Sequence, residues 1–254
     1  MNQNHFSKDL KDCLPTQSFA EENKYKLPST LQESKLVVAD ELKPAVLCTL
    51  LAGIKQASCV VFVSSVESTE TLGNLLSIIE IDTKAIGKIA QYSAAASIQE
   101  REASLEAFRS GEAKVLVCSD AITRGIDIEG IEAVINYDAP VYPKTYVHRA
   151  GRTARAGKTG RVITLLRRED VRHFKAMLRK ADNNYVQDEK LDTQDIQKAK
   201  GWVEEGLKAL RSRLQFTKEE QHEDGTRSNV VEKLRSKRIK KTKKKVKGFP
   251  ELII

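Results

Sequence analysis

The chain has 254 residues, of which 40% are hydrophobic and 31% are charged, and it contains only 13 Gly and 6 Pro. This composition excludes collagen-like, mucin-like and wholly disordered chains, and the length suffices for one large domain with its own core. The net charge of +8 comes from the end of the chain, because residues 227–247 hold 11 Lys or Arg and one acid, whereas residues 1–226 carry −1. We therefore expect a neutral globular part followed by a basic tail.

The first segment, residues 1–30, has no sustained periodicity and includes Pro15 and Pro28, so we expect a linker or a truncated lead-in. It lacks the apolar run of a signal peptide, and no run elsewhere approaches the roughly 18 residues of a membrane helix. We expect an intracellular protein that does not enter a membrane. The four cysteines lack metal-binding spacing, which favours reduced thiols in the core.

Residues 31–181 alternate short apolar runs with amphipathic stretches, the pattern of strands and crossover helices. Continuous apolar strands are typical of a parallel sheet that is covered on both faces. This segment therefore predicts an α/β fold, a doubly wound and mostly parallel sheet with flanking helices. The predicted strands are Lys35–Ala39, Cys59–Ser64, Ile89–Tyr92, Lys114–Cys118, Ala133–Asn136 and Arg161–Leu166.

Three helices are predicted between these strands, and a fourth follows the last strand. Leu72, Leu75, Leu76 and Ile79 repeat at helical spacing. Ser97 and Glu100 form a capping box ahead of the next helix. Pro143 suits the first turn of a short helix that ends near Gly151, and the stretch Glu169–Lys180 is acidic at its start and basic at its end, as the helix dipole prefers.

Beyond Ala181 the pattern changes. Residues 182–194 are polar and aperiodic, which predicts a linker, and residues 195–216 carry an apolar stripe that predicts one long helix. The stripe must pack on something, and docking onto the sheet domain, an intermolecular coiled coil and a partner protein all remain open. Residues 217–254 include the basic run and are expected to be disordered when alone.

Two polar segments follow predicted strands, at residues 119–127 and 148–155. In open α/β sheets ligands bind beyond the carboxyl ends of the strands, so we expect both segments at that edge. The second segment holds three arginines and a histidine, and guanidinium groups suit phosphate oxygens, although a solvated basic loop is the alternative. The Gly-Lys-Thr at 157–159 is no P-loop, because Arg152 stands where the first glycine would be. No DEAD-like acidic tetrad occurs either, so no magnesium ligand is expected.

These segments resemble motifs of the DEAD-box RNA helicases. Ser119–Asp127 is similar to motif V and His148–Arg155 to motif VI, while CVVFVSS at 59–65 resembles motif IV and NYDAP at 136–140 resembles the strand before motif VI. The resemblance covers residues 31–181, the second RecA-like lobe of that family, and is strongest to its nucleolar ribosome-biogenesis branch. It implies the C-terminal half of an ATP-dependent RNA helicase that unwinds short duplexes, with a role in ribosomal RNA processing.

Other interpretations remain. The chain could be a noncatalytic short form that binds RNA or regulates a helicase, or a lobe of a DNA translocase. Because the Walker A and DEAD motifs are absent, we expect no ATPase activity from this chain alone.

The resemblance also implies a nucleotide site. Arg152 and Arg155 match the arginine fingers that reach the γ-phosphate of ATP, which is held with Mg²⁺ mainly by the N-terminal lobe. Asp127 matches the acid that binds the ribose hydroxyls, and Gly125 lets the backbone come close. A buried acid that caps an internal turn is the alternative for Asp127. His148 matches an interdomain relay, although a histidine packed against the core is equally compatible with its position at a helix end.

For RNA, the family binds the sugar-phosphate backbone of a single strand or local duplex without reading the bases. Ser64 and Ser119 match phosphate-contacting positions, although Ser64 could instead cap the following helix. Arg101 lies in the apolar stripe between Ile98 and Leu105, where a guanidinium group is costly without a partner, so we expect it to meet a phosphate at the sheet edge. It also matches an RNA-binding arginine of the family.

The basic tail, residues 227–247, is typical of a nuclear or nucleolar localisation signal and of a segment that binds RNA nonspecifically. A tail that only increases solubility is the alternative. The expected partners are therefore RNA, the N-terminal lobe and pre-ribosomal proteins, and the expected location is the nucleus and its nucleolus.

Overall fold

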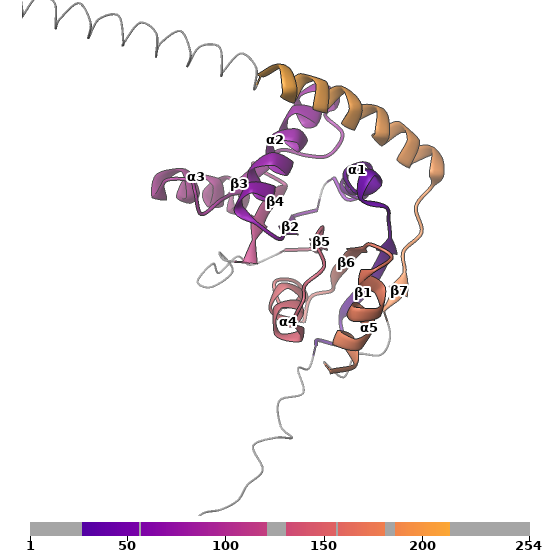
Figure 1. The fold of residues 1–254 in the computed structure, drawn as a ribbon. Coiled ribbons are helices and arrows are strands. Elements are labelled where there is room, and N and C mark those ends of the chain that lie inside the picture. Colours follow the sequence, from indigo (N-terminus) through magenta and orange to yellow (C-terminus); the bar gives the residue numbers. More distant parts are fainter. Residues whose placement is uncertain (1–26, 56, 121–130, 156, 181–185, 214–254) are drawn as a thin grey trace, which may run out of the picture.

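The computed structural model describes residues 27–55, 57–120, 131–155, 157–180 and 186–213. Within them the chain forms a seven-stranded sheet in which every neighbouring pair is parallel, in the order β3-β4-β2-β5-β6-β1-β7 (Figure 1). The elements are β1 (Leu31–Val37), η1 (Asp40–Leu42), α1 (Lys43–Gly53), β2 (Cys59–Val63), α2 (Val66–Thr83), β3 (Ile89–Tyr92), α3 (Ile98–Arg109), β4 (Val115–Ser119), β5 (Ala133–Asn136), α4 (Pro143–Ala150), β6 (Gly160–Leu166), α5 (Asp170–Lys180), β7 (Gln187–Asp188) and a helix at residues 193–213.

The sheet separates two hydrophobic cores. Successive side chains of a strand point to opposite faces, and in β2 the residues Cys59, Val61 and Val63 join one core whereas Val60 and Phe62 join the other. The first core is covered by α1 and α2, and the second by α3, α4 and α5. The expected doubly wound α/β sheet is therefore confirmed, and within the described residues it is wholly parallel.

Several local predictions are confirmed. The strands Ile89–Tyr92 and Ala133–Asn136 have the predicted bounds. The helix α3 begins after Ser97 with the expected capping box, in which the Ser97 side chain accepts from the Glu100 N–H and the Glu100 carboxylate accepts from the Ser97 N–H. Pro143 starts α4, where its missing N–H costs no helical hydrogen bond.

The structure differs from the prediction around β1. This strand begins at Leu31 and ends at Val37, whereas a strand over Lys35–Ala39 was expected. Part of the segment 182–194, expected as a linker, forms β7 and pairs with β1. Backbone pairing holds the two strands, with the Glu189 N–H donating to the Lys35 carbonyl at 2.9 Å, and Lys35 Nζ lies 2.8 Å from the Asp188 carboxylate. No apolar pattern marks such a strand in the sequence.

The helix at residues 193–213 docks on the domain and runs across the α1–α2 layer (Figure 1). Ala199 and Val203 are buried in the same core as Leu75 and Ile79 of α2. Gly206 permits the close approach, because a Cβ there would lie 3.0 Å from side-chain atoms of both α2 residues. Of the alternatives for this stripe, docking onto the sheet domain is the one found. Leu214 and the basic tail lie outside the described residues.

Three cysteines, Cys48, Cys59 and Cys118, are buried and free, as expected for core thiols, and Cys13 lies outside the described residues. Burial raises the pKa of Cys48 and Cys118 to about 12, which keeps both thiols protonated and unreactive. Among the helices of the described ranges, none is long and apolar enough to cross a membrane.

Candidate functional site

A buried arginine joins the ends of two central strands to α4. Arg149 is 2% exposed, and its guanidinium group makes two 2.6 Å hydrogen bonds to the carboxylate of Asp120, which follows β4. Its Nη1 also donates to Asn136 Oδ1 at 3.0 Å and to the Asp138 carbonyl at 2.7 Å, at the end of β5. The group lies 5.0 Å from the centre of the Phe62 ring. A buried charge is tolerated only when it is paired and hydrogen-bonded in this way.

From the sequence, Arg149 was expected only as one of three arginines directed at phosphate. The structure gives it an internal role. A signal for this was present, because Tyr146, Arg149 and Ala150 have the i, i+3, i+4 spacing of one helix face, and all three are buried.

Asp138 extends this network to β2 and α1. Its Oδ2 accepts from the Ser64 N–H at 2.8 Å, and its Oδ1 lies 3.4 Å from the buried Lys43 Nζ. Lys43 also lies 5.2 Å from the centre of the Tyr137 ring. Burial, followed by the nearby Asp138 charge, raises the pKa of Tyr137, which therefore stays neutral. Ser64, Asp120 and Asp138, which follow the ends of β2, β4 and β5, are thus fixed relative to one another at the carboxyl edge of the sheet.

Two predicted RNA-contacting serines lie at this edge on adjacent strands. Ser119 ends β4 opposite Val63 of β2, and Ser64 follows directly. Ser119 is 3% exposed, and its hydroxyl has no hydrogen-bond partner among the described residues. Ser64 is exposed, and the cap of α2 is Ser65, whose side chain accepts from the Ser68 N–H. The alternative that Ser64 caps this helix is therefore wrong.

Arg101 lies on α3, which packs against β3. The strand β3 is the edge strand of the sheet and neighbours β4, which ends at Ser119. The Arg101 Nε is buried and has no partner in the described part of the chain. Leu105 and Phe108, on the same helix face, are buried, but Ile98 is 63% exposed. The apolar stripe thus begins later than expected, because Ile98 is the first residue of the helix and projects beyond the core.

The loop with Arg152 and Arg155 lies at the opposite edge from the one expected. The helix α4 starts beyond the carboxyl end of β5 and runs back for eight residues, about 12 Å, close to the length of the four-residue strand. It ends at the amino edge, where Thr153 Oγ1 donates to the Ile131 carbonyl at 2.6 Å. We expected these arginines at the carboxyl edge, and the length of α4 relative to β5 explains the difference.

The backbone of this loop is held tightly. Ala154 has a positive φ of 55°, and a Cβ on Gly160, at the start of β6, would lie 2.2 Å from Thr153 Oγ1 and 2.5 Å from the Ala154 nitrogen. Only glycine fits at this position. Arg155 is exposed, and its Nε donates to the Gly151 carbonyl at 2.7 Å, which orients the guanidinium group.

An open cleft of about 430 Å³ lies beside this loop. Three cationic side chains and one acid line it, a balance that suits a polyphosphate. Its lining residues are Ile131, Glu132, Arg152, Ala154, Arg155, Lys158 and Thr159. Gly125 and Asp127 lie outside the described residues, so their expected contacts with a nucleotide stay predictions. The described ranges contain no group of three or more acids, histidines or cysteines that could hold a metal ion.

His148 is exposed on α4. The interpretation of this residue as a histidine packed against the core is therefore wrong. Its side chain is accessible to a second domain, and its interdomain role stays a prediction.

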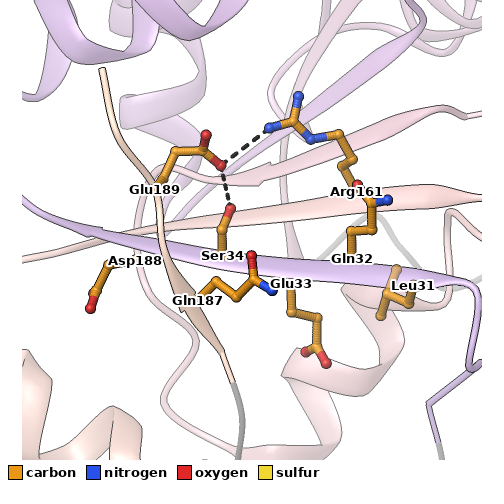
Figure 2. A pocket seen from close by; sticks show the side chains of 8 residues that line it. All are labelled: Leu31, Gln32, Glu33, Ser34, Arg161, Gln187, Asp188 and Glu189. Atoms are coloured by element: carbon orange, nitrogen blue, oxygen red, sulfur yellow. Dashed lines mark hydrogen bonds and ion pairs between the residues drawn. The ribbon is translucent and has the colours of Figure 1, made fainter. Parts of the chain in front are cut away.

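A second hollow of similar volume lies over β1 and β7 (Figure 2). Its polar groups bind one another, because Glu189 accepts from Ser34 Oγ at 2.7 Å and from Arg161 at 3.2 Å. Lys35, by its hydrogen bond and charge, lowers the pKa of Asp188. These contacts explain how β7 is attached and leave few groups here for a ligand. The lining residues are Leu31, Gln32, Glu33, Ser34, Arg161, Gln187, Asp188 and Glu189.

The chain is similar in sequence to known RNA helicases. The family described as the helicase conserved C-terminal domain matches residues 42–157. The DEAD-box ATP-dependent RNA helicase 1 of Oryza sativa subsp. japonica is 41% identical over 192 residues, which cover 76% of this chain and 36% of that protein. The ATP-dependent rRNA helicase RRP3 of Kluyveromyces lactis is 37% identical over 150 residues, which cover 59% of this chain and 29% of that protein.

The fold is also similar to that of a solved DEAD box protein from Methanococcus jannaschii, with a TM-score of 0.57 and 28% identity over 63% of this chain and 42% of that one. The chain thus spans about a third of the length of the sequence relatives named here.

Proposed function

Because this chain belongs to the DEAD-box helicases through its C-terminal RecA-like lobe, we propose that it acts as that half of an ATP-dependent RNA helicase. It would close with an N-terminal lobe on ATP and RNA, and this closure would separate a short duplex. Its relatives are named as helicases of this kind, and the chain matches only their C-terminal helicase region.

One observation supports this proposal most directly. At the carboxyl edge, the Ser119 hydroxyl and the Arg101 Nε are both buried without a hydrogen-bond partner among the described residues. An unsatisfied buried polar group costs about 1–3 kcal/mol, so two such groups near one edge suggest that a ligand supplies the missing partners. A phosphate oxygen can accept from both a hydroxyl and a guanidinium group. We assign this edge, with Ser64, to the RNA backbone.

The cleft at the amino edge is assigned to the nucleotide. ATP would supply the phosphoanhydride bond whose hydrolysis drives the cycle, with Mg²⁺ held mainly by the N-terminal lobe. Arg152 and Arg155 would neutralise charge on its γ-phosphate, a contribution of about 10³- to 10⁵-fold in rate for arginine fingers. Gly125 and Asp127 would hold its ribose, and His148 would relay contact between the lobes.

Arg149 links these two proposed sites. It lies on α4, whose end carries the arginine loop, and it is bonded to Asp120, which directly follows Ser119. A displacement of the RNA edge would therefore be transmitted to α4 through a paired and rigid contact.

The finer role we propose is ribosomal RNA processing in the nucleolus, with pre-ribosomal proteins as further partners. The support is the rRNA helicase among the relatives and the basic run at residues 227–247, which would also grip RNA nonspecifically.

The test compares this chain alone with the same chain joined to the N-terminal lobe of a DEAD-box relative. We expect RNA binding by both proteins, but RNA-stimulated ATP hydrolysis only by the joined protein. Arg155→Ala should abolish turnover and leave RNA affinity intact, whereas deletion after Gly225 should mainly weaken RNA affinity. A joined protein that binds RNA and shows no ATPase activity would favour the noncatalytic RNA-binding alternative.

A further inference from the structure

The order of the strands places a second set of exposed side chains in line with the proposed RNA contacts. Side by side along the carboxyl edge lie the ends of β4, β2, β5 and β6, in that order. Ser119 ends the first of these strands and Ser64 follows the second. The loop after β5 carries Tyr142, and β6 is followed by Arg168 and then by α5 with Arg172. Neighbouring strands are about 4.8 Å apart, so the ends of these four strands span about 14 Å.

Tyr142 stands out among these residues because it is 68% exposed, although large aromatic side chains are usually buried. Its neighbour Val141 is exposed as well. The loop is held in place from two directions. The Val141 carbonyl lies 2.8 Å from His173 Nε2 of α5, and the Asp138 carboxylate accepts from the Ser64 N–H. The exposed ring is therefore presented by a fixed backbone next to the proposed RNA contact at Ser64.

The neighbouring α5 presents a cationic surface. Its exposed residues are lysines and arginines apart from His173 and Ala176, and its buried face holds Phe174, Met177 and Leu178. The exposed cations are Arg172, Lys175, Arg179 and Lys180.

The acids at the start of this helix are already engaged. Arg167 forms ion pairs with both, because its Nε lies 2.7 Å from Asp170 Oδ2 and its Nη1 lies 3.3 Å from Glu169 Oε1. Arg168 and Arg172 are exposed and have no ion-pair partner among the residues that the structure describes. Two guanidinium groups thus remain available for an outside anion.

From this arrangement we infer that the bound RNA strand continues past Ser119 and Ser64 onto a surface formed by Tyr142, Arg168 and Arg172. Tyr142 stacks on a base, and the two arginines take phosphates. A flat exposed ring beside cations is the combination that binds single-stranded nucleic acid without reading its sequence. The inference rests on the proposed RNA function and adds contacts that the helicase motifs do not include.

The experiment measures the affinity of the full chain for a fluorescent single-stranded oligouridylate of about 12 nucleotides, over a range of salt concentrations. Tyr142→Ala should weaken binding by roughly five- to tenfold, the lower part of the range for base stacking, and Tyr142→Phe should restore it. Arg168→Ala with Arg172→Ala removes two phosphate contacts. This double variant should lower the salt-dependence slope by about 1.4 and the affinity by about 20-fold at 0.1 M salt.

The matched control is Lys200→Ala with Arg211→Ala, which removes the same charge from exposed positions of the helix that covers the opposite face of the sheet. This control should keep the wild-type affinity and slope. The inference would be overturned if the RNA affinity and its salt-dependence slope did not change in the Tyr142 and arginine variants. That result would favour an acidic protein as the partner of this surface. Wild-type chain that binds no RNA would overturn the proposed function together with it.

Discussion

Removing Arg149 tests whether its network holds the carboxyl edge together. Arg149→Ala leaves the Asp120 carboxylate, Asn136 Oδ1 and the Asp138 carbonyl without their donor. Breaking a buried ion pair costs about 3–5 kcal/mol. Since the Asp120 side chain is 43% exposed, water can solvate its charge after the change. We therefore expect the free energy of unfolding to fall by about 3 kcal/mol, the lower end of this range. This corresponds to a fall of about 6–12 °C in Tm for a protein of this size.

Urea unfolding followed by tryptophan fluorescence measures this loss. Trp202 is the single tryptophan of the chain, and it packs against the core beneath the helix at 193–213. Arg149→Met separates the contributions, because it keeps the apolar stem over the Phe62 ring and removes the hydrogen bonds. The control is Arg161→Ala, which breaks a partly exposed pair and should cost less than about 1 kcal/mol. A loss below about 1 kcal/mol for Arg149→Ala would refute the reasoning.

Three further predictions concern single positions. Ser65→Ala should lower the free energy of unfolding by about 1 kcal/mol through loss of the α2 cap, whereas Ser64→Ala should leave stability unchanged and weaken RNA binding. Urea unfolding and RNA titration of both variants check this pair, and equal destabilisation would contradict it. Gly160→Ala should cost at least about 2 kcal/mol, because its Cβ would meet backbone as well as side-chain atoms, and a wild-type unfolding curve would argue against the tight loop. The Arg167 hydrogen bond lowers the pKa of Asp170, so this carboxylate stabilises the fold above its unfolded pKa of about 3.9, and the stabilisation is lost as the pH falls further. Asp170→Asn should therefore be less stable than wild type at pH 7, with a difference that shrinks below about pH 4, and a difference independent of pH would rule this out.

Local chemistry in the sequence predicted much of the fold. The strand over Ile89–Tyr92 was evident because a short segment of mainly apolar residues is bounded by Lys88 and Ser93, and the start of α3 because Ser97 and Glu100 have capping-box spacing. The apolar stripe of the last helix predicted a packed face without deciding its partner, and its position over α2 depended on the close approach at Gly206. Patterns of this kind act over a few residues, so they can be read without knowledge of the tertiary structure.

The candidate site was only partly predictable. Ser119 and Ser64 were expected at the carboxyl edge, and the parallel pairing of β2 with β4 places them there. The arginine loop was expected at the same edge and lies at the other, since its position depends on how far α4 runs back along β5. The strand β7 was not predicted because it consists of two exposed polar residues, which form a strand only by pairing with the backbone of β1.

The sequence by itself determined the class of fold, the order of its elements and the residue types that suit phosphate, because periodicity, caps and turn chemistry are local. Only the tertiary structure decided which of those residues face a ligand. Arg149 and Arg152 are three positions apart in the chain, yet one is enclosed by Asp120, Asn136 and Asp138, and the other lines an open cleft. The partners that separate their roles come from distant strands, and only the packing of α4 on the sheet brings them together.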